Sequence, residues 1–478
     1  MGIAYVLGMK ITWNLAAWLR GFNAVVLITV LGLLARLLLS APFPLQELFN
    51  RLTQFLGTPQ MFQIIHRFLG YGAGGKVFAF AGSLGLWLVL LSALGVVSPL
   101  IASVVVLLVC LWLVPFWVAI PTALVYLGIR ILLESQVAGF SDSRRSSLKW
   151  LSVGSGTLVF GGAAALVRTL FPSSTPAVAA VRNAKLPLGI TPQADFYSIS
   201  KNLEAFDPKL EAKNWNLEIK GLVKSKKSYT LEDLQVRPAR DLEATMVCIS
   251  NAVGGGLIGN AIWTGFALSD LLLEVGIQKE ARFLLWKAAD GYTESLPLQA
   301  ALEQDVMLVY AMNYEPLSQK HGFPLRVIIP GRLGMKQPRW ITGIELSATD
   351  QVGYWVERGW SKEAYAQTMS RIDSPNENAG FLKADAIKEI SGIAFSGNTT
   401  ITKVEVSSDG GLNWVVAEIL PRRSKYAWTQ WRSPWTPAAG PHQLVVRAYA
   451  DGVLQPETER DALPEASSGW HKFISNLS

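Results

Sequence analysis

The stretch from Val77 to Ile129 contains no Asp, Glu, Lys or Arg, and this feature constrains the fold of the chain more than any other. About 50 uncharged residues are enough to cross the hydrocarbon core of a bilayer twice. Ser98-Pro99 lies near the middle and predicts a turn between two spans. Pro115 and Pro121 predict kinks in the second span. We therefore expect this part of the chain to lie in a membrane.

Other apolar stretches flank this run. Residues 22–40 are apolar except for Arg36, which can snorkel to the interface, and residues 150–171 are long enough for a further span. Residues 41–76 are amphipathic with a helical period, as in a helix that lies at the interface or packs on the bundle. The sequence predicts that residues 1–172 form an α-helical membrane bundle of about four spans.

Basic residues set the orientation of this bundle. Arg130 and the segment Ser143–Lys149 precede the last span, and Lys and Arg favour the cytoplasmic side. The segment resembles the twin-arginine export signal, with Ser147 where that signal has Phe; it also reads as a simple positively charged anchor. Both interpretations predict a multi-pass protein of the cell inner (or thylakoid) membrane, with everything after Phe171 on the extracytoplasmic side.

The remaining chain has the composition of soluble domains. Residues 173–192 are rich in Pro, Ala, Ser and Thr and form a linker. Residues 193–370 mix strand and helix patterns, which predicts an α+β domain. Residues 371–478 contain alternating segments, one of them followed by the hairpin-turn sequence Asp409-Gly410-Gly411, which predicts a β-sandwich.

Charge and cysteine content exclude several classes of function. The net charge of +7 is modest, and no basic run with interleaved aromatics is present, so we expect no nucleic-acid partner. The four histidines do not lie at metal-ligand spacing, which argues against a zinc site. The two cysteines are Cys110, inside the apolar run, and Cys248, in the soluble part, and a disulfide between them is not expected.

Cys248 begins the sequence Cys-Ile-Ser-Asn-Ala-Val-Gly-Gly-Gly. A thiolate is a soft ligand for a transition metal, and glycines let backbone N–H groups approach an anion. Taken alone, the pattern also fits a small buried residue beside a flexible loop. Its interpretation depends on the motifs that follow it.

These motifs resemble the molybdopterin domain of the sulfite oxidase family in order and spacing over roughly 170 residues. They are Cys248–Gly255, Asn260–Gly265, Leu268–Leu272, Asp290–Tyr292, Met312–Leu317 and His321–Gly331. The C-terminal part resembles the immunoglobulin-like domain that follows the molybdenum domain in this family and often mediates dimers. The resemblance implies a molybdenum-molybdopterin cofactor and a homodimer.

The resemblance also assigns roles to individual residues. Cys248 matches the cysteine whose thiolate ligates molybdenum, and it is our candidate catalytic residue. His321 and Arg326 match positions that bind the pyranopterin and its phosphate. Gly334-Met335-Lys336 matches a loop that completes this grip, and Phe196-Tyr197-Ser198 resembles a segment that contacts the cofactor early in the domain.

The chain departs from the family pattern at the positions that would bind sulfite. The expected early arginine is absent from Ser200–Glu204, where Lys201 is a substitute, and Trp360 occupies or adjoins the place of a tyrosine. Ala252-Val253 stands where the family has an arginine pair. A small dianion needs several fixed cations, so these departures argue against sulfite as the substrate.

The sequence thus predicts a membrane-anchored molybdenum oxidoreductase that transfers oxygen to or from a heteroatom in two-electron steps. Its small-molecule substrate would be an S-oxide, an N-oxide or sulfite. Its partners would be the lipid bilayer and a quinone or membrane electron-transfer protein. The alternative is a non-catalytic cell-surface binding protein that keeps the fold without the metal, because fold alone does not fix function. Cys248 discriminates between the two, since a binding module has no need of it.

Overall fold

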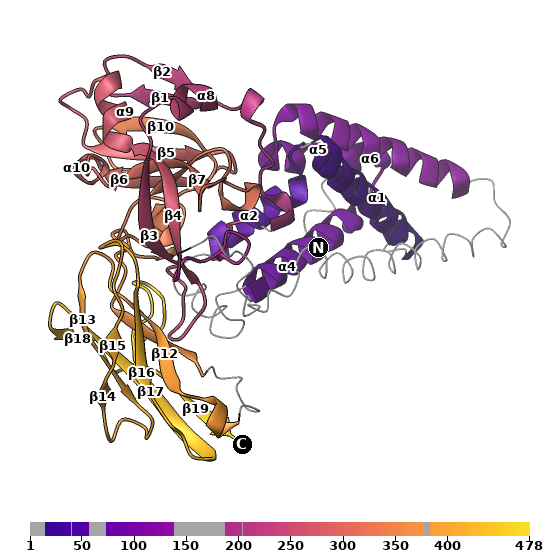
Figure 1. Cartoon of the computed structure of the whole chain (residues 1–478). Coiled ribbons are helices and arrows are strands. Elements are labelled where there is room, and N and C mark those ends of the chain that lie inside the picture. The colour runs from indigo at the N-terminus through magenta and orange to yellow at the C-terminus, as the bar shows by residue number, and fades with distance from the viewer. Residues whose placement is uncertain (1–14, 40, 57–72, 138–186, 203, 376–382) are drawn as a thin grey trace. The chain divides into compact units, whose positions relative to one another are not determined.

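The computed structural model describes residues 15–39, 41–56, 73–137, 187–202, 204–375 and 383–478 (Figure 1). The chain divides into two compact units, Met1–Ser173 and Ser174–Ser478, which are described separately. The twin-arginine-like segment at 143–149, the expected span at 150–171 and most of the expected linker lie outside the described residues.

The described residues of the first unit form helices joined by short connections. Its elements are α1 (Leu15–Leu39), α2 (Pro44–Leu56), α4 (Ala73–Ser92), η1 (Ala93–Val96), α5 (Pro99–Leu113) and α6 (Phe116–Val137). The break at Ser98-Pro99 is confirmed, because the Ser98 side chain caps the start of α5. The prediction that the stretch after Ser98-Pro99 is one kinked helix was wrong. Two helices, α5 and α6, are separated at Pro115, because proline cannot continue the hydrogen-bond ladder of α5.

Small residues allow the helices of this unit to pack closely. Gly21 of α1 lies against the backbone of Ser92 and Gly95, and a Cβ at either glycine would overlap carbonyl atoms of the neighbouring segment. Close approach of this kind is typical of helix pairs in membranes. Helix α1 begins at Leu15, earlier than the apolar stretch alone predicted.

The first domain of the second unit is α+β, as expected. One sheet has the order β2-β1-β10-β5-β6, in which β1 and β10 run parallel and the other pairs are antiparallel. A second, antiparallel sheet has the order β3-β4-β7-β8, with β9 also paired to β7. The strands are β1 (Leu217–Gly221), β2 (Lys227–Tyr229), β3 (Arg240–Val247), β4 (Ile258–Ala267), β5 (Phe283–Ala288), β6 (Thr293–Pro297), β7 (Met307–Met312), β8 (Glu315–Pro316), β9 (Arg326–Ile328) and β10 (Ile341–Ser347).

Short helices cover these sheets. The α-helices are α8 (Leu231–Gln235), α9 (Leu268–Val275) and α10 (Leu298–Ala301), and the 3-10 turns are η2 (Glu204–Phe206), η3 (Ala212–Asn214), η4 (Gln319–His321), η5 (Gly334–Lys336) and η6 (Val356–Arg358). Thr230 and Asp233 form a reciprocal capping box at the start of α8, and Gly276 ends α9 with a positive φ of 71°. Both boundaries follow from local signals in the sequence, a Thr and an Asp three residues apart and a glycine after the last helical residue.

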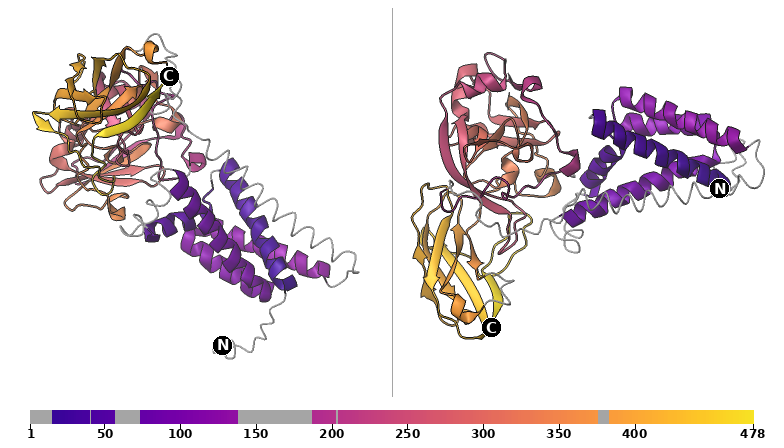
Figure 2. Two further views of the ribbon diagram at one scale, coloured as in Figure 1. Left: turned by 90° about the horizontal axis from the view of Figure 1, so that it is seen from below. Right: turned by 45° about the vertical axis from the view of Figure 1, so that its right-hand side comes forward.

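The C-terminal domain is a sandwich of two sheets around one apolar core. One sheet has the order β11-β12-β16-β15; the other has β14-β13-β17-β18, with β19 paired to β17. Strands β11 (Met369–Ser374), β12 (Glu389–Phe395), β13 (Ile401–Ser407), β14 (Val415–Val416), β15 (Glu418–Ile419), β16 (Thr429–Pro434), β17 (Gly440–Ala450), β18 (Val453–Leu454) and β19 (His471–Leu477) build it, with the turn η7 (Ala384–Ala386). Figure 2 shows these orange and yellow strands at one end of the second unit. Trp431 of β16 and Leu444 of β17 come from different sheets and are both buried in this core.

Candidate functional site

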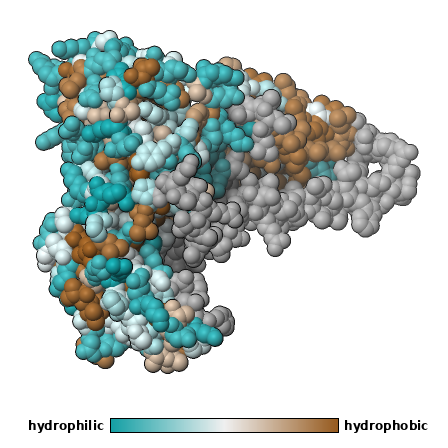
Figure 3. Space-filling model, viewed as in Figure 1, coloured by the Kyte–Doolittle hydropathy of each residue, from teal (hydrophilic) through white to brown (hydrophobic). Residues whose placement is uncertain are grey.

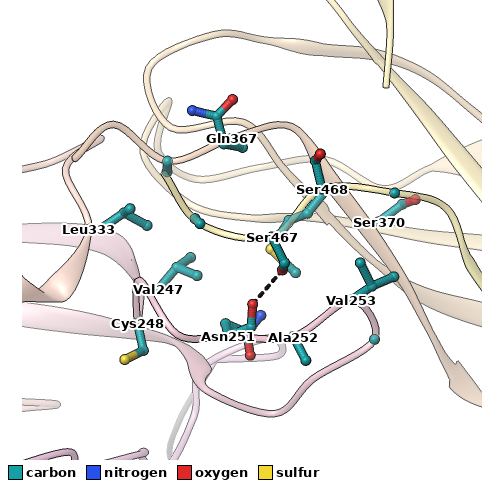
Figure 4. Close-up of a pocket in the computed structure, with 15 residues that line it drawn as sticks. Val247, Cys248, Asn251, Ala252, Val253, Leu333, Gln367, Ser370, Ser467 and Ser468 are labelled. Carbon is teal, nitrogen blue, oxygen red and sulfur yellow. Dashed lines mark hydrogen bonds between the residues drawn. The ribbon is translucent and has the colours of Figure 1, made fainter. Parts of the chain in front are cut away.

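Cys248 lies where β3 ends and the chain turns toward β4. Its backbone N–H donates to the Leu257 carbonyl at 2.9 Å, which closes the mouth of a loop over residues 249–257. The side chain is buried, and Sγ lies 3.1 Å from the hydroxyl oxygen of Ser250. In Figure 4 the sulfur points away from Ser467 and Val253. The hairpin therefore fixes a single thiol at the edge of the second sheet.

Phe196 and Tyr197 pack beside this strand end. The Phe196 ring stacks on Tyr197 with 5.5 Å between centroids and meets the ring of Trp263 edge-on at 5.6 Å. Gly259 of β4 makes room for it, since a Cβ there would lie 2.6 Å from the Phe196 ring. The Tyr197 hydroxyl is buried and has no hydrogen-bond partner among the described residues. Burial raises the pKa of Tyr197 well above its ordinary value, and nearby Cys248 adds to this effect.

Arg326 and His321 form one wall of the same region. Arg326 is buried, its Nη1 donates to the His321 carbonyl at 3.2 Å, and its Nη2 lies 3.3 Å from the Met246 sulfur. Burial, together with the charge of Arg339, lowers the pKa of Arg326 to about 9. His321 Nε2 lies 2.8 Å from the carbonyl of Gln193, and burial lowers the pKa of His321 to about 3. His321 is therefore neutral here, with the Nε2 proton donated to Gln193.

Arg339 is a member of this cluster that the sequence analysis did not select. Its Nη1 donates to the Ser198 hydroxyl at 2.7 Å and its Nη2 to the carbonyl of Ile199 at 3.1 Å. A Cβ on Gly322 would lie 3.0 Å from the Arg339 Cβ and 3.2 Å from the Arg326 Cβ, so this glycine separates the two arginines. The ring of Trp340 supports the Arg339 guanidinium at 4.1 Å.

Lys336 is occupied elsewhere. Its Nζ lies 2.7 Å from Glu294 Oε1 and 3.1 Å from the Ser295 carbonyl, and the ion pair is almost fully buried. In this structure Glu294 neutralises and holds the Lys336 ammonium, and the contact of Lys336 with the cofactor stays a prediction. Lys336 and Arg339 lie three positions apart in the chain. The sequence alone could not show which of these two basic side chains faces the cluster.

The remaining expected site residues lie around the same centre. Gly334 packs on Tyr197, since a Cβ there would lie 2.8 Å from the Tyr197 hydroxyl oxygen. The carbonyl of Met335 accepts a hydrogen bond from the Tyr292 hydroxyl at 2.6 Å. Lys201 donates to Asn202 Oδ1 at 3.1 Å. Trp360 is buried, which places it in the packing of this domain.

The side chains of the cluster fit an anionic, sulfur-liganded cofactor. Two buried polar atoms, Tyr197 Oη and Arg326 Nε, have no partner within the described ranges, although buried polar groups are normally satisfied. Arg326 forms no ion pair with a described carboxylate. A phosphate or similar anion would satisfy these donors and offset the charge of the two arginines, while the thiolate supplies a soft metal ligand.

A small cleft lies on the other face of the cysteine loop (Figure 4). Ala252, Val253 and Gly254 of the loop line it, facing Leu333, Ser467 and Ser468. None of its lining residues carries a charge.

Comparison with known proteins identifies the class of this domain. Residues 204–355 match the model for the oxidoreductase molybdopterin binding domain, and residues 364–473 match that for the Mo-co oxidoreductase dimerisation domain. The chain is 31% identical over 302 residues to mitochondrial sulfite oxidase of Drosophila melanogaster, with 52% of each chain covered. It is 32% identical over 146 residues to the uncharacterized oxidoreductase YuiH of Bacillus subtilis, covering 30% of this chain and 72% of YuiH.

A solved structure shows the same fold. The sulfane dehydrogenase SoxCD of Paracoccus pantotrophus superposes with a TM-score of 0.53 at 24% identity, over 62% of this chain and 85% of that one. The chain spans about half the length of the sulfite oxidase from Drosophila melanogaster that it matches. The fold and the cluster define a molybdopterin-binding domain followed by a β-rich dimerisation domain. The chain belongs to the sulfite-oxidase-like family of molybdopterin oxidoreductases, whose cofactor carries molybdenum.

Proposed function

We propose that this chain is a membrane-anchored molybdenum-cofactor oxidoreductase whose catalytic domain works on the extracytoplasmic side. The observation that carries the proposal is one buried thiol, Cys248, near the unsatisfied hydroxyl of Tyr197, together with the buried Arg326 and the half-buried Arg339. When bound, the cofactor supplies two-electron oxygen-atom transfer to or from a heteroatom of the substrate.

The protein's own residues hold and orient this group. Cys248 provides the thiolate that ligates the metal. Arg326 and Arg339 supply fixed guanidinium donors for the phosphate, and neutral His321 completes this wall. Phe196, Tyr197, Ser198, Gly334 and Met335 shape the surface on which the pterin lies. Lys336 acts indirectly, through the buried pair that holds its turn in place.

The lining of the cysteine loop favours an uncharged substrate. A doubly charged sulfite ion would need fixed cations around the metal. Ala252 and Val253 provide none, and Lys201 is engaged by Asn202. We therefore infer that a neutral S-oxide or N-oxide is a better substrate than sulfite.

The surface of the first unit supports membrane anchoring. Leu31, Leu108 and Leu124 expose 48%, 61% and 62% of their surfaces, while Asn23 and Arg130 are buried between helices. Arg130 donates to the carbonyls of Gly95 and Val97, so its charge is kept from the apolar exterior. Figure 3 shows that the visible surface of the described helices is mostly hydrophobic (brown). Among the described residues of this unit, two helices, at 17–36 and 116–133, are long and apolar enough to span a bilayer, and two others are shorter.

The sandwich supports a homodimer. Its second sheet has Val416, Leu454 and Ile474 on its outer face, with 62%, 38% and 59% of their surfaces exposed. Glu405 and Gln443 lie beside them on the same face, so this surface is mixed. The proposal of a homodimer rests on the match of residues 364–473 to the dimerisation domain. The anchored bundle would bring the catalytic domain near a quinone or a membrane electron-transfer protein.

The metal content of purified full-length protein tests the proposed function. Expressed in a cofactor-competent host, the chain should hold about one molybdenum per chain, and Cys248→Ser should lower metal retention about 10-fold or more. The rates of S-oxide and N-oxide reduction are then measured with an artificial electron donor. They are compared with the rate of sulfite oxidation, measured with an artificial electron acceptor. Cys248→Ser should abolish turnover.

Cys110→Ser is the matched control, because Cys110 is buried in the helical unit. This variant should keep both metal and activity. Molybdenum below about a tenth of an equivalent in the wild-type protein would instead favour a non-catalytic binding protein that retains the fold. Full turnover by Cys248→Ser would remove the ligand assignment.

A further inference from the structure

The C-terminal sandwich contacts the cysteine loop directly. The hydroxyl of Ser467 donates to the carbonyl of Asn251, as the dashed line in Figure 4 shows. Arg371 of β11 donates from Nη1 to the carbonyl of Gly255 at 2.8 Å. Two side chains from separate parts of the sandwich therefore bind two carbonyls of one loop in the preceding domain.

His471 of β19 makes a third contact with the same loop. Its Nδ1 accepts the backbone N–H of Ile372 at 3.0 Å, so the neutral ring carries its proton on Nε2. The Nε2 edge of the ring occupies the space that a Cβ on Gly254 would need. Gly254 has a positive φ of 70°, a conformation that glycine adopts without strain. The ring of His471 therefore leaves no room for the loop to shift toward the sandwich.

Hydrogen bonds inside the loop connect these contacts to the thiol. The Asn251 N–H donates to the Cys248 carbonyl at 3.0 Å, and Asn251 Oδ1 accepts the Leu257 N–H at 2.8 Å. The Gly255 N–H donates to the Ala252 carbonyl at 2.9 Å. A displacement of Asn251 therefore reaches Cys248 through a single hydrogen bond. The loop behaves as one stiff unit whose outer side rests on the sandwich.

We propose that Ser467, Arg371 and His471 are positioning residues that fix Cys248 for the metal, so that the sandwich is a working part of the metal site as well as a dimerisation module. The inference rests on the proposed function, because it takes Cys248 as the metal ligand. The contacts of all three residues with the loop are made at residues 251–255, beyond the cysteine itself. Release of the loop should leave the cluster of arginines intact while the sulfur becomes mobile.

Thiol reactivity in the full-length, cofactor-free protein provides the first test. The chain is produced in a host that makes no molybdopterin and is treated with iodoacetamide, and peptide mass spectrometry follows Cys248 and Cys110 separately. The double variant Ser467→Ala/Arg371→Gln should raise the alkylation rate of Cys248 at least about threefold, because local opening exposes the buried sulfur. Hydrogen exchange at residues 251–255 should rise with it.

Two matched controls separate positioning from a general loss of stability. Ser468→Ala removes the neighbouring hydroxyl, which points away from Asn251 in Figure 4. Arg447→Gln removes a sandwich arginine that packs on Trp414 at 3.8 Å and pairs with Glu405. Both should keep the wild-type alkylation rate. In metal-loaded protein, the double variant should shift the thiolate-to-metal absorption band, which the two controls should leave in place.

The outcomes distinguish this inference from the proposed function. If the wild-type chain binds no molybdenum, the proposed function fails, while alkylation and hydrogen exchange still report on the loop. If the wild-type chain binds molybdenum but the double variant keeps both the wild-type alkylation rate and the wild-type absorption band, the sandwich does not position Cys248. An equal rise in the alkylation rate of Cys248 in the double variant and in Arg447→Gln would also overturn the inference. The loop would then respond to any weakening of the sandwich.

Discussion

Lys336 and Glu294 form a buried ion pair in which Nζ lies 2.7 Å from Oε1, with 3% and 1% of the two side chains exposed. The pair fastens the turn Gly334–Lys336 to strand β6, and the Ser295 carbonyl accepts a second hydrogen bond from Lys336. Glu294 Oε2 has no partner among the described residues, and burial raises the pKa of Glu294. The turn that packs on Tyr197 therefore depends on an interaction that is costly to break.

Loss of the lysine from this pair should destabilise the fold. Lys336→Met leaves the Glu294 carboxylate buried without a counter-ion, and we expect a loss of about 3 to 5 kcal/mol in the free energy of unfolding. The double variant Lys336→Met/Glu294→Leu should recover most of this loss, because apolar side chains replace both charges. Thermal unfolding of the detergent-solubilised full chain measures both effects.

Lys287→Met is the matched control for that experiment. Lys287 pairs with Glu345 at 2.8 Å, but 45% and 33% of these side chains are exposed. Exposed pairs contribute only about 0 to 1 kcal/mol, so the control should unfold close to the wild-type temperature. Equal destabilisation by the two lysine substitutions would contradict the account of a buried, structural Lys336.

Arg339 should matter for cofactor retention more than Lys336 does directly. Its guanidinium lies beside Arg326 and can donate in parallel to a phosphate, which a methionine cannot do. Arg339→Met should weaken retention of molybdopterin about 10-fold or more, with a small effect on folding. The measurement is the pterin content of purified protein, read by fluorescence after oxidation.

Lys320→Met serves as the comparison for Arg339→Met. The Lys320 side chain is exposed, and only its backbone carbonyl meets Arg339, so the substitution keeps that contact. It should retain the pterin at the wild-type level. Wild-type pterin content in Arg339→Met would show that Arg326 and His321 suffice for the phosphate.

Much of the fold could be predicted from local sequence rules. The capping box of Thr230 and Asp233, the end of α9 at Gly276, and the hairpin turn that contains Gly410 and Gly411 all depend on residues close together in the chain. Cys248 could be found because the motifs that follow it resemble a known family in order and spacing. These features need no knowledge of distant partners.

Other features depend on contacts between distant residues. Lys336 and Arg339 are equally basic, and only Glu294, some 40 residues earlier in the chain, decides which of them faces away from the cofactor region. Pro115 could kink a long helix or end it, and the packing of α5 against α6 selects the second outcome. The contacts of Ser467 and Arg371 with the cysteine loop join positions more than 100 residues apart and leave no local signal.

Gly259→Ala should disturb the aromatic part of the cluster. A Cβ at Gly259 would lie 2.6 Å from the Phe196 ring, so the ring must move from its stack on Tyr197. Overpacking of this kind costs about 1 to 3 kcal/mol and should also lower pterin content. Gly343→Ala in β10 is the control, because its Cβ would meet Lys287 only at an ordinary 3.4 Å. Adding Phe196→Leu to Gly259→Ala should restore part of the stability.

The neutral state of His321 predicts a pH dependence of stability. The pKa of His321 falls from the ordinary 6.5 to about 3 in the folded protein, chiefly because of burial. Between these values the unfolded chain binds a proton that the folded chain does not, so the free energy of unfolding falls as pH drops below 6.5. From pH 6.5 to 5 the contribution is at most about 2 kcal/mol, since one pKa unit corresponds to about 1.4 kcal/mol.

A bound anion should reduce this dependence, because a phosphate beside His321 favours the charged imidazole and raises its pKa. The midpoint of thermal unfolding, followed from pH 7 to 5, should therefore fall more steeply in cofactor-free protein than in metal-loaded protein. His321→Gln keeps a donor for the Gln193 carbonyl but cannot titrate, so it should flatten the cofactor-free curve. Curves of equal slope for the cofactor-free and metal-loaded proteins would place the phosphate away from His321.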